Sequence, residues 1–371
     1  MIQRRLNSNF FMIGYFLYLF SFYFFYASNI NKVFVVDTAY HYTIYLAGIF
    51  LILSCFFVIW SLKRLLISLV LLVVSIIYFI RSKDNTILIT SLIMVAGQQI
   101  NLKSFFKKDL LARCIIFLIV FTLCVTNLIP ETTTLRDNGS VRIALGFAQA
   151  NTTGAIVFSI ISEWVILKHG FLNKYNYFVL LLSLILVNYV TNSRSTVIGI
   201  LLVAALCWKL TPDISTWLHR LFLILFPLFA TIDYITTKYY SAHGIMLQLN
   251  ALFSGRIQLI HYFIQHFDVT IFGQLIPTKD PNNLKNTYYL VVDNSYVSML
   301  LRYGLVFLVV FGMLYILFIH KIIVRKSIGI LTISIVFLII ANMENTLYIP
   351  AYNIVVPFLI NIPFGETVDE D

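Results

Sequence analysis

Charged residues are scarce in this chain, and that scarcity excludes most soluble folds. Lysine, arginine, aspartate and glutamate make up 11% of its 371 residues, whereas hydrophobic residues make up 60% and the mean hydropathy is +0.89. Soluble domains average about 25% charged and about 45–50% apolar residues. A chain this apolar needs a lipid bilayer around it, so the composition predicts an all-α polytopic membrane protein.

Cysteine is scarce as well, and all four cysteines lie inside apolar runs. None has the spacing of a disulfide framework or of a metal site, so they are typical of small core hydrophobic residues. The four are Cys55, Cys114, Cys124 and Cys207.

Apolar runs of membrane-spanning length, about 20 residues for a helix, recur from one end of the chain to the other. We treat residues 1–371 as a single integral-membrane domain with about twelve transmembrane helices. One polar insertion, 237–293, interrupts the series, and a loop of that length usually has a function. The expected spans are 10–28, 42–60, 65–80, 86–101, 111–129, 151–167, 177–191, 195–209, 220–236, 294–319, 327–345 and 350–363.

The distribution of basic residues predicts the orientation. With a cytoplasmic N-terminus, fifteen lysines and arginines, Arg113 among them, fall in or near inner loops, and six fall in the short outer loops. Basic residues are enriched on the cytoplasmic side. Both termini are therefore expected in the cytoplasm and 237–293 outside. The net charge of +10 is accounted for by the anionic inner leaflet and predicts no nucleic-acid partner.

The long loop contains a segment with helical periodicity. Residues 251–267 place apolar side chains at helical spacing, which predicts an amphipathic helix lying at the membrane surface. Arg256 lies near its start. Its two histidines, His261 and His266, have no orienting partner at a recognisable spacing, and exposed histidines in loops often have no specific role.

Two outward-facing stretches before this loop carry arginines. Arg142 leads into a span whose first turn contains Asn151, and a helix N-terminus suits phosphate binding. An ordinary capped helix with a solvated arginine explains this spacing equally well. Arg194 follows Asn192 in a turn so short that the arginine sits near the membrane surface, facing either a ligand or, by snorkelling, the solvent.

The exit of the loop carries a carboxylate and another arginine. Asp293 or Asn294 is expected to cap the next span, in which Tyr296 follows, and Arg302 lies about two turns deeper. An arginine at that depth should face the protein interior or a wet cavity. Alternatively, Asp293 is only a helix cap and Arg302 only part of a structural ion pair.

Three further acidic residues lie within or near predicted spans. Glu344 and Asp233 are near the outer side, where either could be the counter-ion of an arginine. Glu163 falls near the inner end of its span and is expected to be a structural or snorkelling charge.

Taken in order, these stretches carry a resemblance to a known family. The order is R-x-x-L-G-F-x-x-x-N from Arg142, N-S-R-S from Asn192, a G-R pair ending at Arg256, and D-N-S-Y…L-L-R-Y-G from Asp293. Over residues 136–345 this resembles the Wzy-type polysaccharide polymerases of the O-antigen ligase/polymerase superfamily. The resemblance implies a membrane glycosyltransferase of the bacterial cytoplasmic membrane. Such an enzyme joins undecaprenyl-diphosphate-linked oligosaccharide repeat units on the outer face, beside a flippase and a chain-length regulator.

One departure from the wider superfamily is relevant. The related O-antigen ligases carry a histidine near the end of the large loop, where this chain has Asp293. This difference favours a polymerase over a ligase and leaves open which residue acts as general base.

The residues suggest a mechanism for such an enzyme. Arginine is permanently cationic and matches phosphate oxygens in a bidentate manner. We therefore expect Arg142, Arg194, Arg256 and Arg302 to bind the lipid diphosphate, with Asp293 and Arg302 as catalytic residues. The outer regions contain no D-x-D-like pair, so no metal or other cofactor is predicted. A lipid-linked oligosaccharide flippase, an O-antigen-ligase-type transferase and a non-catalytic scaffold are the alternatives. The expected glycan or acceptor contacts are Asn151, Asn192, Asn294, Tyr296 and Glu344.

Overall fold

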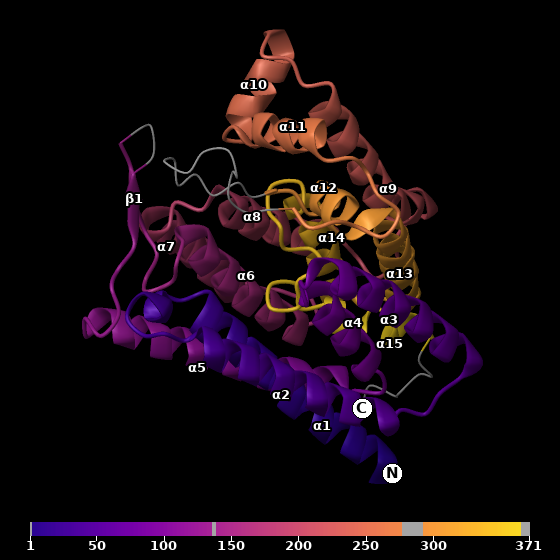
Figure 1. The fold of residues 1–371 in the computed structure, drawn as a ribbon. Coiled ribbons are helices and arrows are strands. Elements are labelled where there is room, and N and C mark those ends of the chain that lie inside the picture. Colours follow the sequence, from indigo (N-terminus) through magenta and orange to yellow (C-terminus); the bar gives the residue numbers. More distant parts are fainter. Residues whose placement is uncertain (1, 136–138, 277–291, 365–371) are drawn as a thin grey trace.

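The computed structural model describes residues 2–135, 139–276 and 292–364, and these are predominantly helical (Figure 1). Within them, six helices are long and apolar enough to cross a membrane, which makes the chain an all-α membrane protein in broad class. Three shorter apolar helices accompany them. The six are Gln3–Tyr26, Asp37–Phe56, Leu62–Ser82, Ala150–Leu167, Thr216–Lys238 and Ser295–Val324.

The helices form one bundle, and a short antiparallel hairpin of β1 (Thr133–Leu135) and β2 (Val141–Ile143) projects from it (Figure 1). The α-helices are α1 Ile2–Phe20, α2 Asp37–Phe56, α3 Leu62–Ser82, α4 Thr86–Ala96, α5 Leu102–Val125, α6 Ala150–Leu167, α7 Lys174–Val190, α8 Arg194–Lys209, α9 Thr216–Lys238, α10 Gly244–Leu252, α11 Arg256–His266, α12 Ser295–Ser298, α13 Gly304–Val324, α14 Ile328–Ile340 and α15 Asn361–Phe364. Two π-helices (Ser21–Tyr26, Met299–Tyr303) and two 3-10 helices (Asn29–Lys32, Val356–Phe358) complete the helical elements.

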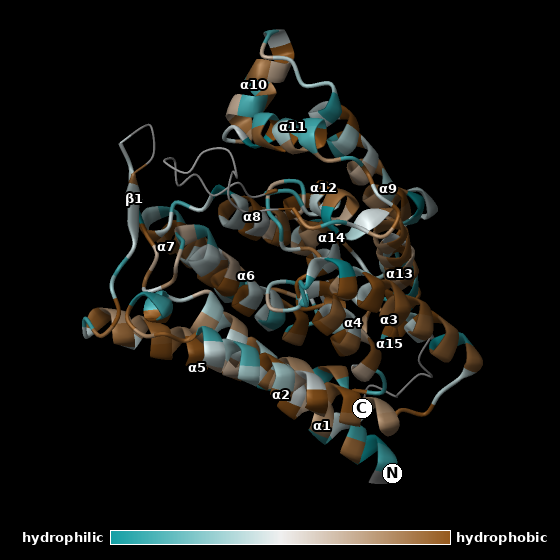
Figure 2. Ribbon diagram, in the orientation of Figure 1, coloured by the Kyte–Doolittle hydropathy of each residue, from teal (hydrophilic) through white to brown (hydrophobic). Residues whose placement is uncertain are grey.

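The outer surfaces of the bundle are apolar, as a lipid environment requires. Figure 2 shows hydrophobic colour along the helices and hydrophilic colour mainly at their ends and in the connecting segments. Ile49 of α2, Leu69 of α3 and Phe178 of α7 are among many large hydrophobic side chains left exposed. In water such an apolar surface would be strongly unfavourable, whereas in lipid it carries no penalty.

The last predicted span, 350–363, is not a spanning helix. The chain there runs through turns, the 3-10 helix Val356–Phe358 and the four residues of α15, and most of it is fully buried. Pro350, Pro357 and Pro363 supply no backbone N–H, which disfavours a continuous helix. Irregular backbone is tolerated at membrane depth where protein surrounds it. Asn353 helps to satisfy this backbone by donating to Leu347 O (2.7 Å) and accepting from Val355 N (3.2 Å).

The described part of the long loop, up to residue 276, contains two helices where the sequence predicted one over 251–267. α10 and α11 are separated by Phe253, Ser254 and Gly255, of which Ser254 and Gly255 have positive φ (57° and 80°). The predicted extent is therefore wrong, because left-handed residues cannot continue a helix. α11 buries Ile257, Ile260 and Phe263 against other parts of the chain, and α10 protrudes above it (Figure 1). Residues 277–291 of the loop lie outside the described residues.

The loop joins the bundle at a break in the predicted span 294–319. A π-helix ends at Tyr303, and Gly304 has φ +90° before α13 continues. The break exposes backbone groups, and the loop pairs with them: Leu305 N donates to Thr270 O (3.0 Å) and Gln274 N donates to Arg302 O (2.9 Å). A Cβ on Gly304 would lie 2.3 Å from Gly273 N, so only glycine permits this approach.

A fully buried ionic cluster joins α1, α5, α6 and the C-terminal segment. The Arg113 guanidinium contacts Glu163 (Nε–Oε1 2.9 Å) and Asp109 (Nη2–Oδ2 3.2 Å), and all three side chains have 0% exposure. Tyr15 and Tyr23 and the carbonyls of residues 350 and 351 accept from the same guanidinium. The expectation that Arg113 lies in or near an inner loop is therefore wrong, and of the two alternatives for Glu163, structural or snorkelling, the contacts show the structural one. α5 begins at Leu102, nine residues before the predicted span, and places Arg113 inside the bundle.

Candidate functional site

Segments far apart in the sequence converge on the carboxylate of Glu344. Its Oε1 atom accepts hydrogen bonds from Asn151 Nδ2 (3.1 Å), Ser195 Oγ (2.8 Å) and Arg256 Nη2 (2.9 Å). The Glu344 and Arg256 side chains retain 15% and 18% of their accessible surface. The cluster is therefore largely desolvated but still open to solvent, which strengthens its electrostatic interactions relative to those at a free surface.

Three helix N-termini place these donors. Asn151 is the second residue of α6, Ser195 the second of α8, and Arg256 the first of α11, and none of the three helices has a side-chain cap. Free N–H groups and the helix dipole give each terminus a partial positive charge. Gly154 lets α6 and α8 approach each other here, because a Cβ on it would lie 2.5 Å from Thr196 Oγ1. The arrangement favours a negative group at the centre, and Glu344 supplies one.

Arg142 extends the cluster on the side of the hairpin. It belongs to β2, its Nε donates to the Thr191 carbonyl (3.0 Å), and its Nη2 donates to Asn151 Oδ1. Asn151 therefore links Arg142 to Glu344, since its amide oxygen accepts from the arginine and its nitrogen donates to the carboxylate. Arg142 and Arg256 lie 114 positions apart in the chain and share this network.

Asp293 adds a second carboxylate beside Arg256. Its Oδ2 lies 3.6 Å from Arg256 Nε, and its side chain retains 32% of its accessible surface. The pKa of Asp293 is raised from 3.8 to about 6, first by burial and then by the negative charge of Glu344, against an opposing effect of Arg256. A carboxylate with a pKa near 6 is largely deprotonated at neutral pH yet more basic than an exposed aspartate.

Arg194 and Asn192 lie at the edge of the cluster. Arg194 is exposed and donates from Nη1 to Ser254 Oγ (3.2 Å), in the turn between α10 and α11. Asn192 donates to Ser140 Oγ (2.9 Å), beside the hairpin. The described hydrogen bonds of Arg194 and Asn192 go to Ser254 and Ser140 and not to Glu344. Of the four arginines predicted to bind diphosphate, Arg142 and Arg256 are therefore the two that share the Glu344 network.

Arg302 belongs to a different group of side chains. Its electrostatic partners are Tyr303, Tyr348, Asp84 and Tyr78, and its buried Nε has no hydrogen-bond partner among the described residues. The described contacts include no hydrogen bond or ion pair between Arg302 and the Glu344 cluster. They bring Arg142 and Arg256 into the cluster, leave Arg194 at its edge, and place Arg302 in a neighbouring group.

Asn294 and Tyr296 have structural contacts. Asn294 is the N-cap of α12, with Oδ1 accepting from Val297 N (3.0 Å), so of the two expected caps the structure selects Asn294. Its Nδ2 donates to Asp233 Oδ2 (2.5 Å), a contact with no signal in the sequence. The buried Tyr296 hydroxyl donates to Leu338 O (2.8 Å), which satisfies it within the bundle.

A small cavity lies beneath the polar cluster. Asn151, Ser195 and Glu344 line it with Phe158, Phe337 and other apolar side chains. Buried Thr346 Oγ1, which also lines it, has no hydrogen-bond partner among the described residues. No group of three histidine, cysteine or acidic residues in the described ranges is placed to hold a metal ion.

The sequence pointed to most members of this cluster but not to their convergence on one carboxylate. The prediction that Glu344 could be the counter-ion of an arginine is confirmed by its ion pair with Arg256 (2.9 Å), whereas the hydrogen bond from Ser195 was not predicted. The one available signal was a carboxylate flanked by amides at the end of an apolar span, Asn342 to Asn345. Comparison with known proteins adds no further assignment, because no family model, no curated protein and no solved structure matches this chain.

Proposed function

We propose that this chain is a membrane glycosyltransferase that polymerises undecaprenyl-diphosphate-linked oligosaccharides, as its resemblance to Wzy-type polymerases implies. The observation that carries the proposal is the cluster of Arg142, Arg256, Asn151, Glu344 and Asp293. Two arginines, three helix N-termini and a carboxylate of raised pKa meet there in a partly open site. This combination suits a reaction that expels a diphosphate and deprotonates a hydroxyl.

The proposed reaction requires positive charge beside its leaving group, undecaprenyl diphosphate. When the bond between the anomeric carbon and the diphosphate oxygen breaks, the electron pair stays with the undecaprenyl diphosphate and its negative charge grows. In the structure the Arg256 guanidinium contacts both Glu344 and Asp293. Arg142 donates hydrogen bonds to the Thr191 carbonyl and to Asn151. An arriving diphosphate replaces these contacts and bonds with both guanidinium groups.

Asp293 is the proposed base. It accepts the proton of the acceptor hydroxyl while that oxygen bonds to the anomeric carbon, so the products are an extended glycan, free undecaprenyl diphosphate and a protonated Asp293. Glu344 raises the pKa of Asp293 and so its proton affinity. The sugar contacts assigned to Asn192, Asn294 and Tyr296 and the diphosphate contacts of Arg194 and Arg302 belong to the same proposal.

The proposal includes a location and a topology. The chain crosses the bacterial cytoplasmic membrane about twelve times, with both termini in the cytoplasm. The Glu344 cluster and the loop 237–293, which covers it as a lid, face outward. The buried irregular segment after α14 makes the twelfth crossing in place of a helix. A flippase and a chain-length regulator are the expected partners.

The test is in vitro polymerisation by the purified full-length protein with a defined undecaprenyl-diphosphate oligosaccharide, with and without a chelator. Arg142→Ala and Arg256→Ala each remove a charged hydrogen bond worth about 1.5–3 kcal/mol. The rate should therefore fall roughly 10- to 150-fold in each variant. Arg81→Ala is the matched control, because Arg81 is an exposed arginine at the end of α3 that is outside the cluster. Failure of the wild-type protein to lengthen the glycan, or full activity in both cluster variants, would refute the proposal.

A cellular experiment separates this function from its alternative. Cells lacking the protein should display single repeat units outside the membrane. Units trapped on the inner leaflet would instead identify a flippase.

A further inference from the structure

A second cavity lies at the end of the bundle away from the Glu344 cluster. It is formed where α5 begins, where α6 ends and where α13 turns into α14, and its volume is about 440 Å³. α6 runs from Asn151, in the cluster, to Leu167, which lines this cavity. The two sites are therefore separated by the full length of an eighteen-residue helix, about 27 Å.

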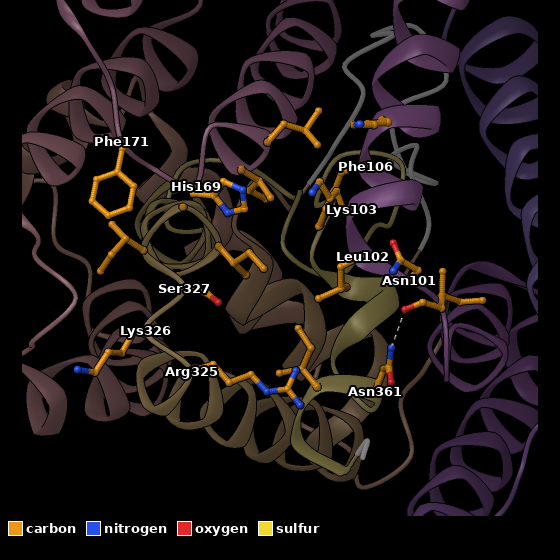
Figure 3. Close-up of a pocket in the computed structure, with 18 residues that line it drawn as sticks. Asn101, Leu102, Lys103, Phe106, His169, Phe171, Arg325, Lys326, Ser327 and Asn361 are labelled. Carbon is orange, nitrogen blue, oxygen red and sulfur yellow. Dashed lines mark hydrogen bonds between the residues drawn. The ribbon is translucent and has the colours of Figure 1, made fainter. Parts of the chain in front are cut away.

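The cavity is lined by cations. Lys103 and Lys107 come from α5, and Arg325 and Lys326 come from the turn after α13, whereas no acidic side chain lines it among the described residues. His169 is a further lining residue, and Figure 3 shows His169 and Lys103 on one side of the cavity and Arg325 on the other. Positive charge is therefore concentrated around one space.

Three of these cations have no partner in the part of the chain that the structure describes. Lys326 forms an ion pair with Asp213 (2.5 Å), but within the described residues Lys103, Lys107 and the Arg325 side chain make no ion pair or hydrogen bond. The Arg325 Nε atom is also shielded from solvent. An unpaired, shielded guanidinium nitrogen is unfavourable, so the site lacks an anionic acceptor at this position.

The rest of the lining is apolar. Phe106, Ile166, Leu167 and Ile328 border the same space as the cations. A free inorganic anion gains nothing from such surface, whereas a lipid places its phosphate among cations and its glycerol and acyl chains against hydrocarbon. Basic pockets between helices at the ends of membrane spans have this composition where they hold phospholipid headgroups.

We propose that this cavity binds the phosphate-bearing headgroup of an anionic phospholipid through Arg325, Lys103 and Lys107. This inference goes beyond the proposed glycosyltransferase activity and does not depend on it. The apolar part of the lining contacts the start of the acyl chains, and the headgroup phosphate accepts from the Arg325 Nε atom.

The test is native mass spectrometry of the purified full-length protein titrated with cardiolipin, phosphatidylglycerol or phosphatidylcholine. The wild-type protein should bind the two anionic lipids at least tenfold more tightly than phosphatidylcholine. Arg325→Gln combined with Lys107→Gln should weaken anionic lipid binding at least tenfold. Lys168→Gln combined with Lys174→Gln is the control for charge at the same end of the bundle and should change binding less than twofold.

Two further experiments distinguish a phospholipid from the other groups that could occupy the cavity. Inorganic phosphate and diphosphate should not compete with the lipid at millimolar concentration, and competition by either would show a free-anion site and overturn the lipid assignment. Neutralising the acidic C-terminal residues to their amides should not increase lipid binding tenfold. If it does, the occupant is the chain's own tail and the proposal fails. Monodisperse elution and an unchanged Tm in lipid-free detergent verify that each variant is folded. The neutralised residues are Glu366, Asp369, Glu370 and Asp371.

Discussion

The raised pKa of Asp293 leads to a pH dependence that Glu344 should control. With a pKa of about 6, Asp293 is about 90% deprotonated at pH 7 and about 10% deprotonated at pH 5. If Asp293 accepts the proton of the acceptor hydroxyl, the polymerisation rate falls roughly tenfold between these two pH values. Asp293→Asn removes the base and should lower the rate at pH 7 by about 100-fold or more.

Glu344→Gln provides the sharper test, because it keeps the shape of the side chain and removes its charge. The negative charge of Glu344 raises the pKa of Asp293, whereas Arg256 lowers it. Without that charge, the pKa of Asp293 falls from about 6 toward 3.8, but not fully to it, because burial is the larger cause and remains. Arg256, released from its 2.9 Å contact with Glu344, acts in the same direction.

The assay is the initial rate of glycan lengthening by purified protein from pH 4.5 to 8, at lipid-linked substrate concentrations well below KM, where the rate reports kcat/KM and the pKa of the free enzyme. Glu344→Gln should be slower than the wild type at pH 7 but should retain a larger share of its pH 7 rate at pH 5. The rate of Glu344→Gln should start to fall at a lower pH than the wild-type rate does. A fall at the same or a higher pH would refute the claim that the charge of Glu344 raises the pKa of Asp293. A wild-type rate that does not change between pH 5 and 7 would refute Asp293 as the base.

Three further predictions concern the framework of the site. Arg113→Met leaves Asp109 and Glu163 buried without their cation, so it should cost about 3–5 kcal/mol and abolish monodisperse elution in size-exclusion chromatography. Gly304→Ala should lower Tm and activity because its Cβ meets Gly273 N at 2.3 Å, whereas Gly244→Ala, another positive-φ site but with open space around it, should lower Tm only slightly. Arg194→Ala should reduce the rate, but less than Arg256→Ala does, because Arg194 is exposed and solvent screens its contact with the diphosphate; an unchanged rate would show that the diphosphate does not reach Arg194.

The local pattern predicted the elements around the site better than their contacts. Asn294 caps its helix as expected because capping depends on residues three positions away. The helix predicted over 251–267 is one turn too long at its N-terminal end, because Ser254 and Gly255 take positive φ and α11 begins only at Arg256. The break at Gly304 could not be seen at all, because the groups that satisfy its backbone lie about thirty residues upstream.

For the site, too, the sequence indicated individual residues better than the contacts between them. Arg142, Arg256 and Asp293 stood out individually because a charge beside an apolar span is costly without a partner. Their meeting with Asn151, Ser195 and Glu344 was not predicted, because these residues approach one another from positions as far as 193 residues apart. Arg113 was misplaced for this reason: a basic residue near a predicted loop resembles a solvated one until its two carboxylates and two tyrosines are brought to it.

Composition and apolar periodicity by themselves determined that this is a helical membrane protein, because the free energy of moving apolar surface out of water adds up along the chain without regard to its fold. The tertiary structure alone decided which charges are paired. Electrostatic and hydrogen-bond energies depend on separations of a few ångströms between groups that the sequence does not place side by side. That dependence put Glu344 at the centre of three helix N-termini, gave Asp293 its raised pKa, and left the Arg325 side chain beside a cavity with no partner among the described residues.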